Sequence, residues 1–184
     1  MLPYQISLRK PKRLDADFIV WLDTPDAVRE HVLMQAPPTL EQAANVIERW
    51  LTFNNPYGYF IIEIGTDHTP VGWVHAKPCV HVDGAVELGW RLHPNFWGQG
   101  IATTAALMLI QMFRERDSEV VFTATTLRAN IRSQRVMERL RMKILREYLH
   151  NDVHPAELYW LPSGRHISSD YHSRGIISTV KEQG

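Results

Sequence analysis

The chain has little cysteine and no excess of either charge, and both shortages limit what it can be. Cys79 is its single cysteine among 184 residues, so no disulfide can form within the chain. This fits a reducing compartment. Lys and Arg number 20, as do Asp and Glu, so the net charge provides no general attraction to nucleic acid or to an anionic membrane.

Long apolar runs are also absent. No run approaches the ~18 apolar residues that a membrane span requires, and the first residues lack the apolar core of a signal peptide. We therefore expect a cytoplasmic protein without nucleic-acid or membrane partners. Since 45% of the residues are apolar, the chain can bury a large core in one domain, as a monomer or a homodimer.

Hydrophobic patterning predicts strands and helices in one continuous domain. Alternating apolar residues indicate strands, and apolar residues recurring every three to four positions indicate helices. Thr39 and Gln42 have the spacing of a capping box, which predicts that a helix begins there. In chain order, we expect a strand at 4–10, two short helices between 15 and 32, a helix at 39–51, strands at 59–65, 70–77 and 84–92, a helix at 98–116, a strand at 119–126, a helix at 130–140, and strands at 142–149 and 156–161.

Short connections between the three strands before residue 93 favour an antiparallel meander. Strand, helix and strand around 98–116 imply one parallel pair. The sequence therefore predicts an α/β (α+β) fold: a mixed, mostly antiparallel sheet of six to seven strands with a central parallel pair and flanking helices. Residues 1–162 form this domain, and 163–184 form a polar tail. Four tryptophans fall on apolar faces and are expected in the core: Trp21, Trp50, Trp73 and Trp160.

The most informative short run is HPNFWGQGIATTA, from His93 to Ala105. Two glycines lie one residue apart, after an aromatic pair and before a helix. The first N–H groups of a helix lack partners within the helix and carry partial positive charge, and glycine lets a ligand approach the backbone closely. The run favours either a pyrophosphate site or a simple tight turn, and its own residues do not decide between them.

Two common phosphate loops do not fit this run. A P-loop requires Gly-Lys-Ser/Thr, which is absent. A dinucleotide fingerprint requires its glycines directly after a strand and an acid about twenty residues later. Here five residues separate Leu92 from Gly98, and Thr103 takes the third glycine position. The next strand ends in Thr125 and Thr126 without an acid, so nicotinamide binding is not expected.

A third pattern fits far better. ELGWRLHPNFWGQGIATTA, followed by ATTLRANIRSQRVMERL, resembles the GNAT N-acetyltransferase superfamily, and in particular the branch of ribosomal-protein N-terminal (Rim-type) acetyltransferases. The layout from Ile6 to Leu161 follows that branch. The resemblance implies a GNAT fold, acetyl-CoA as the acyl donor and an amine as the acceptor.

The family's acyl-CoA loop reads Gln/Arg-x-x-Gly-x-Gly/Ala, and it maps here onto Trp97, Gly100 and Ala102. Trp97 departs from Gln/Arg, although Trp is common at this place in the branch. By resemblance, backbone N–H groups of the loop would hold the CoA pyrophosphate, and the edge of the strand ending at Leu92 would bond the pantetheine arm as an added β-strand does. The cofactor-binding residues implied are Leu92, Trp97, Gly98, Gln99, Gly100, Ile101, Ala102, Thr103, Asn130 and Ser133.

Asn130 and Ser133 match the family's Asn-x-x-Ser. In related enzymes the Asn contacts pantetheine and the Ser often lies near the leaving sulfur, although Asn130 also suits a helix cap. The usual Tyr of this helix is replaced by Met137, and the usual LGF ending reads Leu-Arg-Met. Ser133, or a water, is then the candidate that protonates the sulfur. These departures are also compatible with a protein that binds CoA but reacts slowly.

Glu87 is the leading candidate for a general base. It lies in AVELGW, between apolar neighbours on the strand that leads to the loop, which is an unusual place for a charge. In this branch an acid at this point is often proposed as the base. The alternative is an ion pair with Arg91, two residues along the same face of the strand.

Other reactive side chains indicate less. In the segment from His75 to Asp83, two histidines, a cysteine and an acid all occupy odd-numbered positions and could face one way. Their spacing matches no common zinc site, so no metal is expected. His31 and His75 are candidates for the lining of an acceptor cleft. Cys79 lies beside a turn, away from the cofactor motifs, which favours direct attack by the amine over a covalent enzyme intermediate.

The sequence therefore predicts an N-acetyltransferase that moves an acetyl group from acetyl-CoA to a primary amine in a ternary complex. The acceptor is a protein N-terminal α-amine or a small-molecule amine such as a polyamine. An α-amine, with a pKa of about 7.7–8.0, needs less help from a base than a lysine at about 10.4. The alternative is a catalytically weak acyl-CoA-binding or regulatory module.

Overall fold

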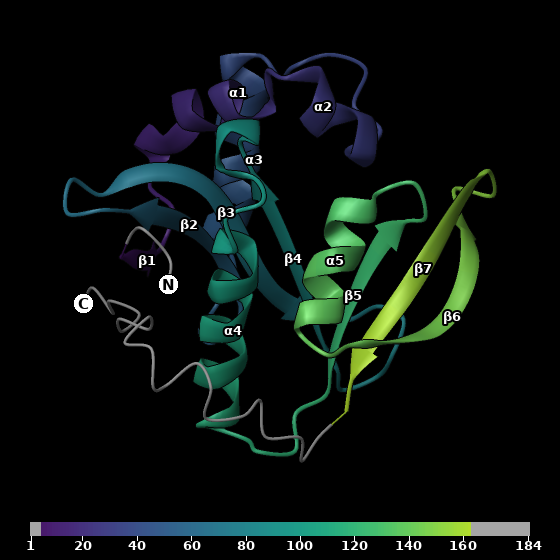
Figure 1. Cartoon of the computed structure of the whole chain (residues 1–184). Coiled ribbons are helices and arrows are strands. Elements are labelled where there is room, and N and C mark those ends of the chain that lie inside the picture. Colours follow the sequence, from purple (N-terminus) through teal and green to yellow (C-terminus); the bar gives the residue numbers. More distant parts are fainter. Residues whose placement is uncertain (1–4, 163–184) are drawn as a thin grey trace.

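The computed structural model describes residues 5–162 of the chain. Seven strands form one sheet in the order β1-β2-β3-β4-β5-β7-β6 (Figure 1). Neighbouring strands are antiparallel except β4 and β5, which are parallel. The predicted mixed sheet with a central parallel pair is confirmed, and the predicted tail at 163–184 lies outside the described residues. The strands are β1 (Ile6–Arg9), β2 (Gly58–Ile64), β3 (Thr69–Pro78), β4 (Val86–Leu92), β5 (Phe122–Leu127), β6 (Lys143–His150) and β7 (His154–Leu161).

The helices mostly follow the expected order. In the predicted capping box, the Thr39 hydroxyl accepts a bond from the Gln42 N–H (3.2 Å), and the Gln42 side chain accepts one from the Thr39 N–H (2.8 Å). Within residues 5–162, no helix is long and apolar enough to cross a bilayer. The α-helices are α1 (Ala16–Asp23), α2 (Asp26–Arg29), α3 (Leu40–Leu51), α4 (Ile101–Arg114) and α5 (Ile131–Arg139), with 3₁₀ segments η1 (Arg13–Asp15), η2 (Glu30–Val32) and η3 (Pro94–Phe96).

The predicted start of the helix at Gly98 is wrong, because α4 begins at Ile101. Gly98 has a φ of 75° and Gly100 a φ of 80°. Both values lie outside the right-handed helical region, so the two glycines form a loop ahead of the helix. This difference matters for the site, since it places the first free helical N–H groups after Gly100.

Helices cover both faces of the sheet. Ile62 and Val74 belong to the buried cluster that contains α4 and part of α5, whereas Ile61 and Trp73 pack with α1 and α3. Because successive residues of a strand point to opposite faces, these alternating residues build one core on each side of β2 and β3. The central strands are therefore covered on both faces, whereas most residues of the edge strand β6 are exposed.

The prediction that four tryptophans are buried is confirmed for Trp50 and Trp73 and wrong for Trp21. Trp21 is 41% exposed, because Ile19 and Leu22 take the buried face of α1. Its ring instead stacks on His93, with ring centroids 4.0 Å apart. Trp160 is only partly buried.

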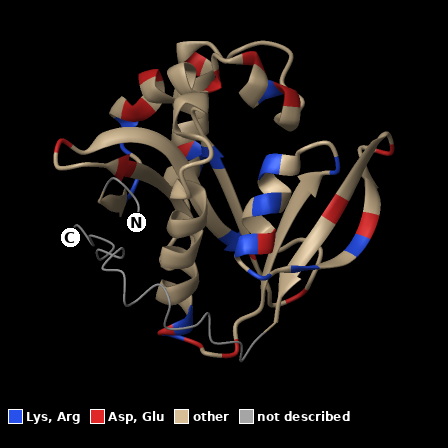
Figure 2. Ribbon diagram, viewed as in Figure 1, with Lys and Arg blue, Asp and Glu red and all other residues tan. Residues whose placement is uncertain are grey.

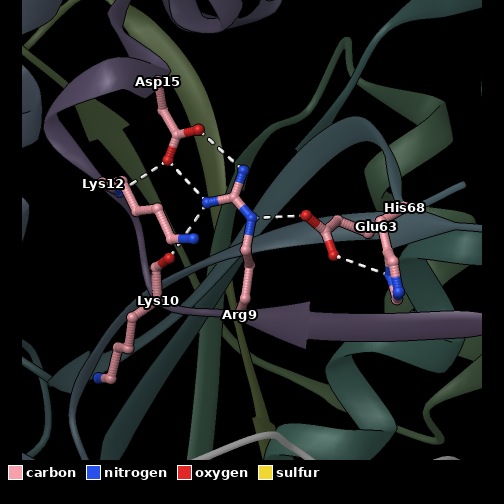
Figure 3. A network of polar contacts seen from close by, with 6 residues as sticks. All are labelled: Arg9, Lys10, Lys12, Asp15, Glu63 and His68. Atoms are coloured by element: carbon pink, nitrogen blue, oxygen red, sulfur yellow. Dashed lines mark hydrogen bonds and ion pairs between the residues drawn. The ribbon is translucent and has the colours of Figure 1, made fainter. Parts of the chain in front are cut away.

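A network of ion pairs connects β1 to its neighbours (Figure 3). The Arg9 guanidinium lies 2.8 Å from the Asp15 carboxylate of η1 and also pairs with Glu63 of β2. His68 approaches Glu63 from the β2–β3 turn, at 3.3 Å. The network fixes the direction in which the chain leaves the sheet to begin α1.

Candidate active site

The parallel strands β4 and β5 share only a short ladder. Val86 pairs with Phe122 and Glu87 with Thr123, and the strands diverge beyond this point (Figure 1). Among the described residues, the edge of β4 from Leu88 to Leu92 therefore has no strand partner on the side of β5. Backbone groups along such an edge can pair with an extended ligand.

A cavity of about 240 Å³ lies at this opening. Its walls come from α2 and η2, the unpaired end of β4, the loop before α4, and α5. One predicted cofactor residue, Gln99, is not part of the lining, because its side-chain amide donates to the Asn95 carbonyl (3.0 Å) within the loop. The other nine line the cavity: Leu92, Trp97, Gly98, Gly100, Ile101, Ala102, Thr103, Asn130 and Ser133.

The loop and the start of α4 present unpaired donors to this cavity. No side chain caps α4, and the first N–H groups of a helix have no partner within it. The Thr103 hydroxyl is buried and has no hydrogen-bond partner, although its residue lines the cavity. A Cβ atom at Gly98 would meet nothing within 4 Å, so the loop leaves room beside its backbone. This arrangement suits a bound anion.

Trp97 connects the loop to the strand. Its indole nitrogen donates a 2.7 Å hydrogen bond to the Leu92 carbonyl. The other side of the ring system is covered by Arg132 of α5, whose Cζ atom lies 4.4 Å from the ring centroid. At this separation the pair is a cation–π contact. Trp97 therefore fixes the distance between three walls of the cavity: β4, the loop and α5.

Three arginines of α5, which the sequence motifs do not identify, complete the cavity. Arg132, Arg135 and Arg139 all line it, and their i, i+3, i+7 spacing places them on one helical face. Figure 2 shows the resulting row of positive charge along α5. None of the three forms an ion pair within residues 5–162. The spacing itself was the signal that could have revealed them.

Asn130 and Ser133 lie at the start of α5. The Asn130 side chain accepts a 3.1 Å hydrogen bond from the Ser133 N–H and so caps the helix. This is the capping role that the sequence offered beside a contact with pantetheine. Asn130 still lines the cavity. Met137, which stands where a Tyr is usual, is buried in the core at 1% exposure, and its thioether has no proton to donate.

Glu87 lies at the vertex where β4 and β5 part, but it does not line the cavity. The expected alternative, an ion pair with Arg91, is wrong, because Arg91 bonds both carboxylate oxygens of Asp23 in α1 at 2.8 Å. Glu87 pairs instead with Lys77 across the β3–β4 hairpin at 3.0 Å. Burial by itself raises the pKa of Glu87, but His75 and Lys77 outweigh burial and hold that pKa below its usual value.

The two histidines suggested for an acceptor cleft differ in position. His31 lines the cavity from η2, whereas His75 is buried behind β4 and does not. Burial lowers the pKa of His75, so its ring is neutral. Within residues 5–162, no group of three or more His, Cys, Asp or Glu side chains could hold a metal ion.

The comparisons with known proteins decide the family. A family model described as an acetyltransferase (GNAT) domain matches residues 5–143, more than half of the chain. The chain belongs to the GNAT acetyltransferase family. The family that the sequence motifs resemble is therefore confirmed. The opening between β4 and β5 lies within the matched residues.

Solved GNAT structures resemble this domain at low sequence identity. A GNAT-family acetyltransferase from Bacillus anthracis is 18% identical, with a TM-score of 0.69, over 86% of this chain and 95% of that one. The ribosomal L7/L12 α-N-protein acetyltransferase RimL, solved with coenzyme A, is 16% identical, with a TM-score of 0.68, over 89% and 97%. A putative acetyltransferase from Salmonella typhimurium, solved with acetyl-CoA, is 16% identical, with a TM-score of 0.66, over 90% and 98%.

Proposed function

We propose that this protein transfers an acetyl group from acetyl-CoA to the nitrogen of a primary amine. The observation that carries the proposal is the convergence of phosphate-binding donors on one cavity beside an unpaired strand edge. The uncapped start of α4, the unpartnered Thr103 hydroxyl and the arginines of α5 all line it. Two structural neighbours with CoA or acetyl-CoA bound support the choice of donor.

The parts of acetyl-CoA correspond to different walls of the cavity. In this proposal the N–H groups of 98–103 hold the pyrophosphate at the helix N-terminus. Arg135 and Arg139, which form no ion pair with any residue in the described range 5–162, bind the remaining phosphate oxygens. The edge of β4 pairs with the amide groups of pantetheine, and Asn130 and Ser133 border the same arm. The thioester then lies toward the vertex at Glu87.

The residues at the vertex can move the proton of the acceptor. Acetyl-CoA supplies an activated thioester carbonyl, which the amine attacks directly. Glu87 accepts a proton from the amine, because it is ionised and lies where the two strands separate. Ser133 or a water protonates the departing sulfur, since Met137 cannot. Cys79 lies in the β3–β4 connection, outside the cavity lining, and carries no acetyl group in this scheme.

The acceptor that suits this site is an α-amine of a protein N-terminus, with a small-molecule amine as the other member of the class. An α-amine has a pKa of about 7.7–8.0 and is substantially neutral near pH 7.5, whereas a lysine at about 10.4 is not. A weakly basic Glu87 helps most with an amine that is already neutral. The RimL neighbour is named for acetylation of an α-amine, which supports this choice.

A panel of acceptors tests the proposal. Release of free CoA thiol is measured with an α-amine peptide, a lysine peptide with a blocked N-terminus, and a polyamine, for the wild type and for Glu87→Gln. We expect amine-dependent release that is fastest with an α-amine or a small amine and strongly reduced in the variant. Release that does not depend on any amine would reject the proposal.

A second candidate, a weak acyl-CoA-binding or regulatory module, is favoured by one observation. The buried Met137 removes the usual proton donor from α5. Such a module would bind CoA with high affinity and release no amine-dependent thiol in the same panel. Binding measured by calorimetry beside the thiol assay separates the two functions.

A further inference from the structure

The Glu87 carboxylate has a cationic partner that the sequence motifs do not include. Lys77 lies directly opposite Glu87 in the antiparallel β3–β4 pairing. Its Nζ atom is 3.0 Å from Glu87 Oε1, within the range of a charge-assisted hydrogen bond. Glu87 is 8% exposed, while the Lys77 side chain keeps 31% of its surface accessible. The pair therefore joins a buried carboxylate to an ammonium at the rim of the sheet.

His75 forms the wall beside this pair. It lies opposite Gly89, where an added Cβ atom would come within 2.5 Å of the imidazole ring. Its Nε2 atom is 3.8 Å from Glu87 Oε1, beyond a hydrogen bond, and neither ring nitrogen has a hydrogen-bond partner. The ring is neutral because burial lowers its pKa. The buried His75 ring therefore lies beside Glu87 without adding a charge.

The remaining groups around Glu87 are neutral or already paired. Tyr59 of β2 and Tyr148 of β6 both interact electrostatically with Glu87, and burial raises the pKa of each phenol, so both are uncharged. Arg91 lies further along β4, and its guanidinium bonds Asp23. Within residues 5–162, Lys77 is the only permanently charged cation paired with Glu87.

We propose that Lys77 is a positioning residue for acetyl transfer, which keeps Glu87 ionised and holds Oε1 so that Oε2 faces the acceptor amine. The inference rests on the proposed function. In the reaction, a nitrogen–carbon bond replaces the carbon–sulfur bond of the thioester. One proton moves from the nitrogen to Glu87. The CoA thiolate takes a proton from Ser133 or water, and Glu87 then returns its proton to that group. Lys77 contacts neither the acetyl donor nor the amine, and acts only through Glu87.

The pH dependence of kcat/KM tests this role. With an α-amine peptide, kcat/KM of the wild type should fall toward low pH. The logarithm of kcat/KM plotted against pH should have a slope of about one there, because only the amine titrates. In Lys77→Met only the contact with His75 still offsets the burial of Glu87, so the pKa of Glu87 rises and a second ionisation enters the acid limb. The slope should then steepen toward about two. Lys77→Arg keeps the cation and should return the slope to about one.

Two controls separate a role in proton transfer from a role in folding. The melting temperatures of both Lys77 variants identify any loss of structure, and Lys77→Arg reports on the charge alone. In Lys77→Met combined with Glu87→Gln, the steepening should disappear, because the group that titrates is gone. A steep limb that persists in the double variant would assign the second ionisation to another residue and overturn the proposal.

The pKa of Glu87 can also be measured directly, without turnover and therefore without any acceptor amine. The carboxyl carbon of Glu87 is followed by ¹³C NMR in protein labelled at glutamate and assigned with Glu87→Gln. The pKa of Glu87 should be higher in Lys77→Met than in the wild type. An unchanged pKa together with an unchanged slope, in an active wild type, would reject the role of Lys77 alone. Absence of wild-type turnover with every amine would instead reject the proposed function.

Discussion

The indole nitrogen of Trp97 donates a 2.7 Å hydrogen bond to the carbonyl oxygen of Leu92, the last residue of β4. This bond closes the loop that carries the two glycines back onto the strand edge. Trp97 stands where many relatives of the family have Gln or Arg, and here its ring also supports Arg132 of α5. One side chain thus sets the width of the cavity that we assign to CoA.

Replacing Trp97 by Phe should weaken CoA binding while the chain still folds. The ring volume largely remains, but the bond to Leu92 is lost. Because a neutral hydrogen bond contributes about 0.5–1.5 kcal/mol, the dissociation constant should rise roughly 2- to 13-fold. Calorimetry measures this change, with Trp160→Phe as the control because Trp160 does not line the cavity. Equal effects of the two substitutions would contradict the assignment.

Two glycines provide a matched test of the loop. Gly98 and Gly84 have φ values of 75° and 72°, and a Cβ atom on either would meet nothing within 4 Å. Alanine should destabilise both variants by a similar amount, about 1–2 kcal/mol, because both must adopt a left-handed conformation. Only Gly98→Ala should also weaken CoA binding, since Gly84 lies outside the cavity lining. Urea denaturation and calorimetry give the two quantities, and unaltered CoA affinity in Gly98→Ala would remove the loop from the binding site.

The arginines of α5 should contribute to CoA affinity in a salt-dependent way. Arg135→Gln should raise the dissociation constant roughly 2- to 5-fold at low salt, the size expected for an exposed charge pair. The difference from wild type should shrink as salt screens the phosphates. Arg13→Gln is the control, because it removes the same charge from η1, outside the cavity lining. A difference from wild type that is independent of salt would argue against a phosphate contact at Arg135.

The pair formed by Asp23 and Arg91 should be essential for stability. The Asp23 side chain is only 4% exposed, and removal of one partner leaves the buried charge of the other uncompensated. Asp23→Ala should therefore lower the free energy of unfolding by about 3–5 kcal/mol. Asp17→Ala, at an exposed position of the same helix, should change it by less than about 0.5 kcal/mol. A small effect at Asp23 would mean that α1 is held to β4 by its apolar contacts alone.

The fold could be predicted because its signals are local. Strand alternation, the Thr39–Gln42 box and the Asn130 cap each depend on a few neighbouring residues. The start of α4 could not be predicted in the same way, because the pattern of apolar residues continues through Gly98 and Gly100, and only their positive φ values interrupt the helix. The exposure of Trp21 likewise depends on how α1 is rotated against the sheet, which its own sequence does not determine.

Site residues could be predicted where they belong to contiguous motifs. Contacts between residues distant in the sequence could not be predicted in this way. The partner of Arg91 is Asp23, 68 residues earlier in the chain, and no local pattern connects them. The contact between Lys77 and Glu87 had a usable signal: opposite charges on two strands joined by a short connection form cross-strand pairs when the register aligns them. The catalytic role of Glu87 stays a prediction.

Acetyl transfer to an amine is tested by following the acetyl group itself. The full chain is incubated with acetyl-CoA labelled with ¹³C in the acetyl group and with a lysine-free peptide that has a free α-amine. Mass spectrometry and thiol measurement then follow both products. We expect one labelled acetyl group on the peptide α-nitrogen for each thiol released, and an unlabelled Cys79. Bound CoA with no label on this peptide or on small amines, or label on Cys79 that precedes label on the peptide, would contradict this expectation.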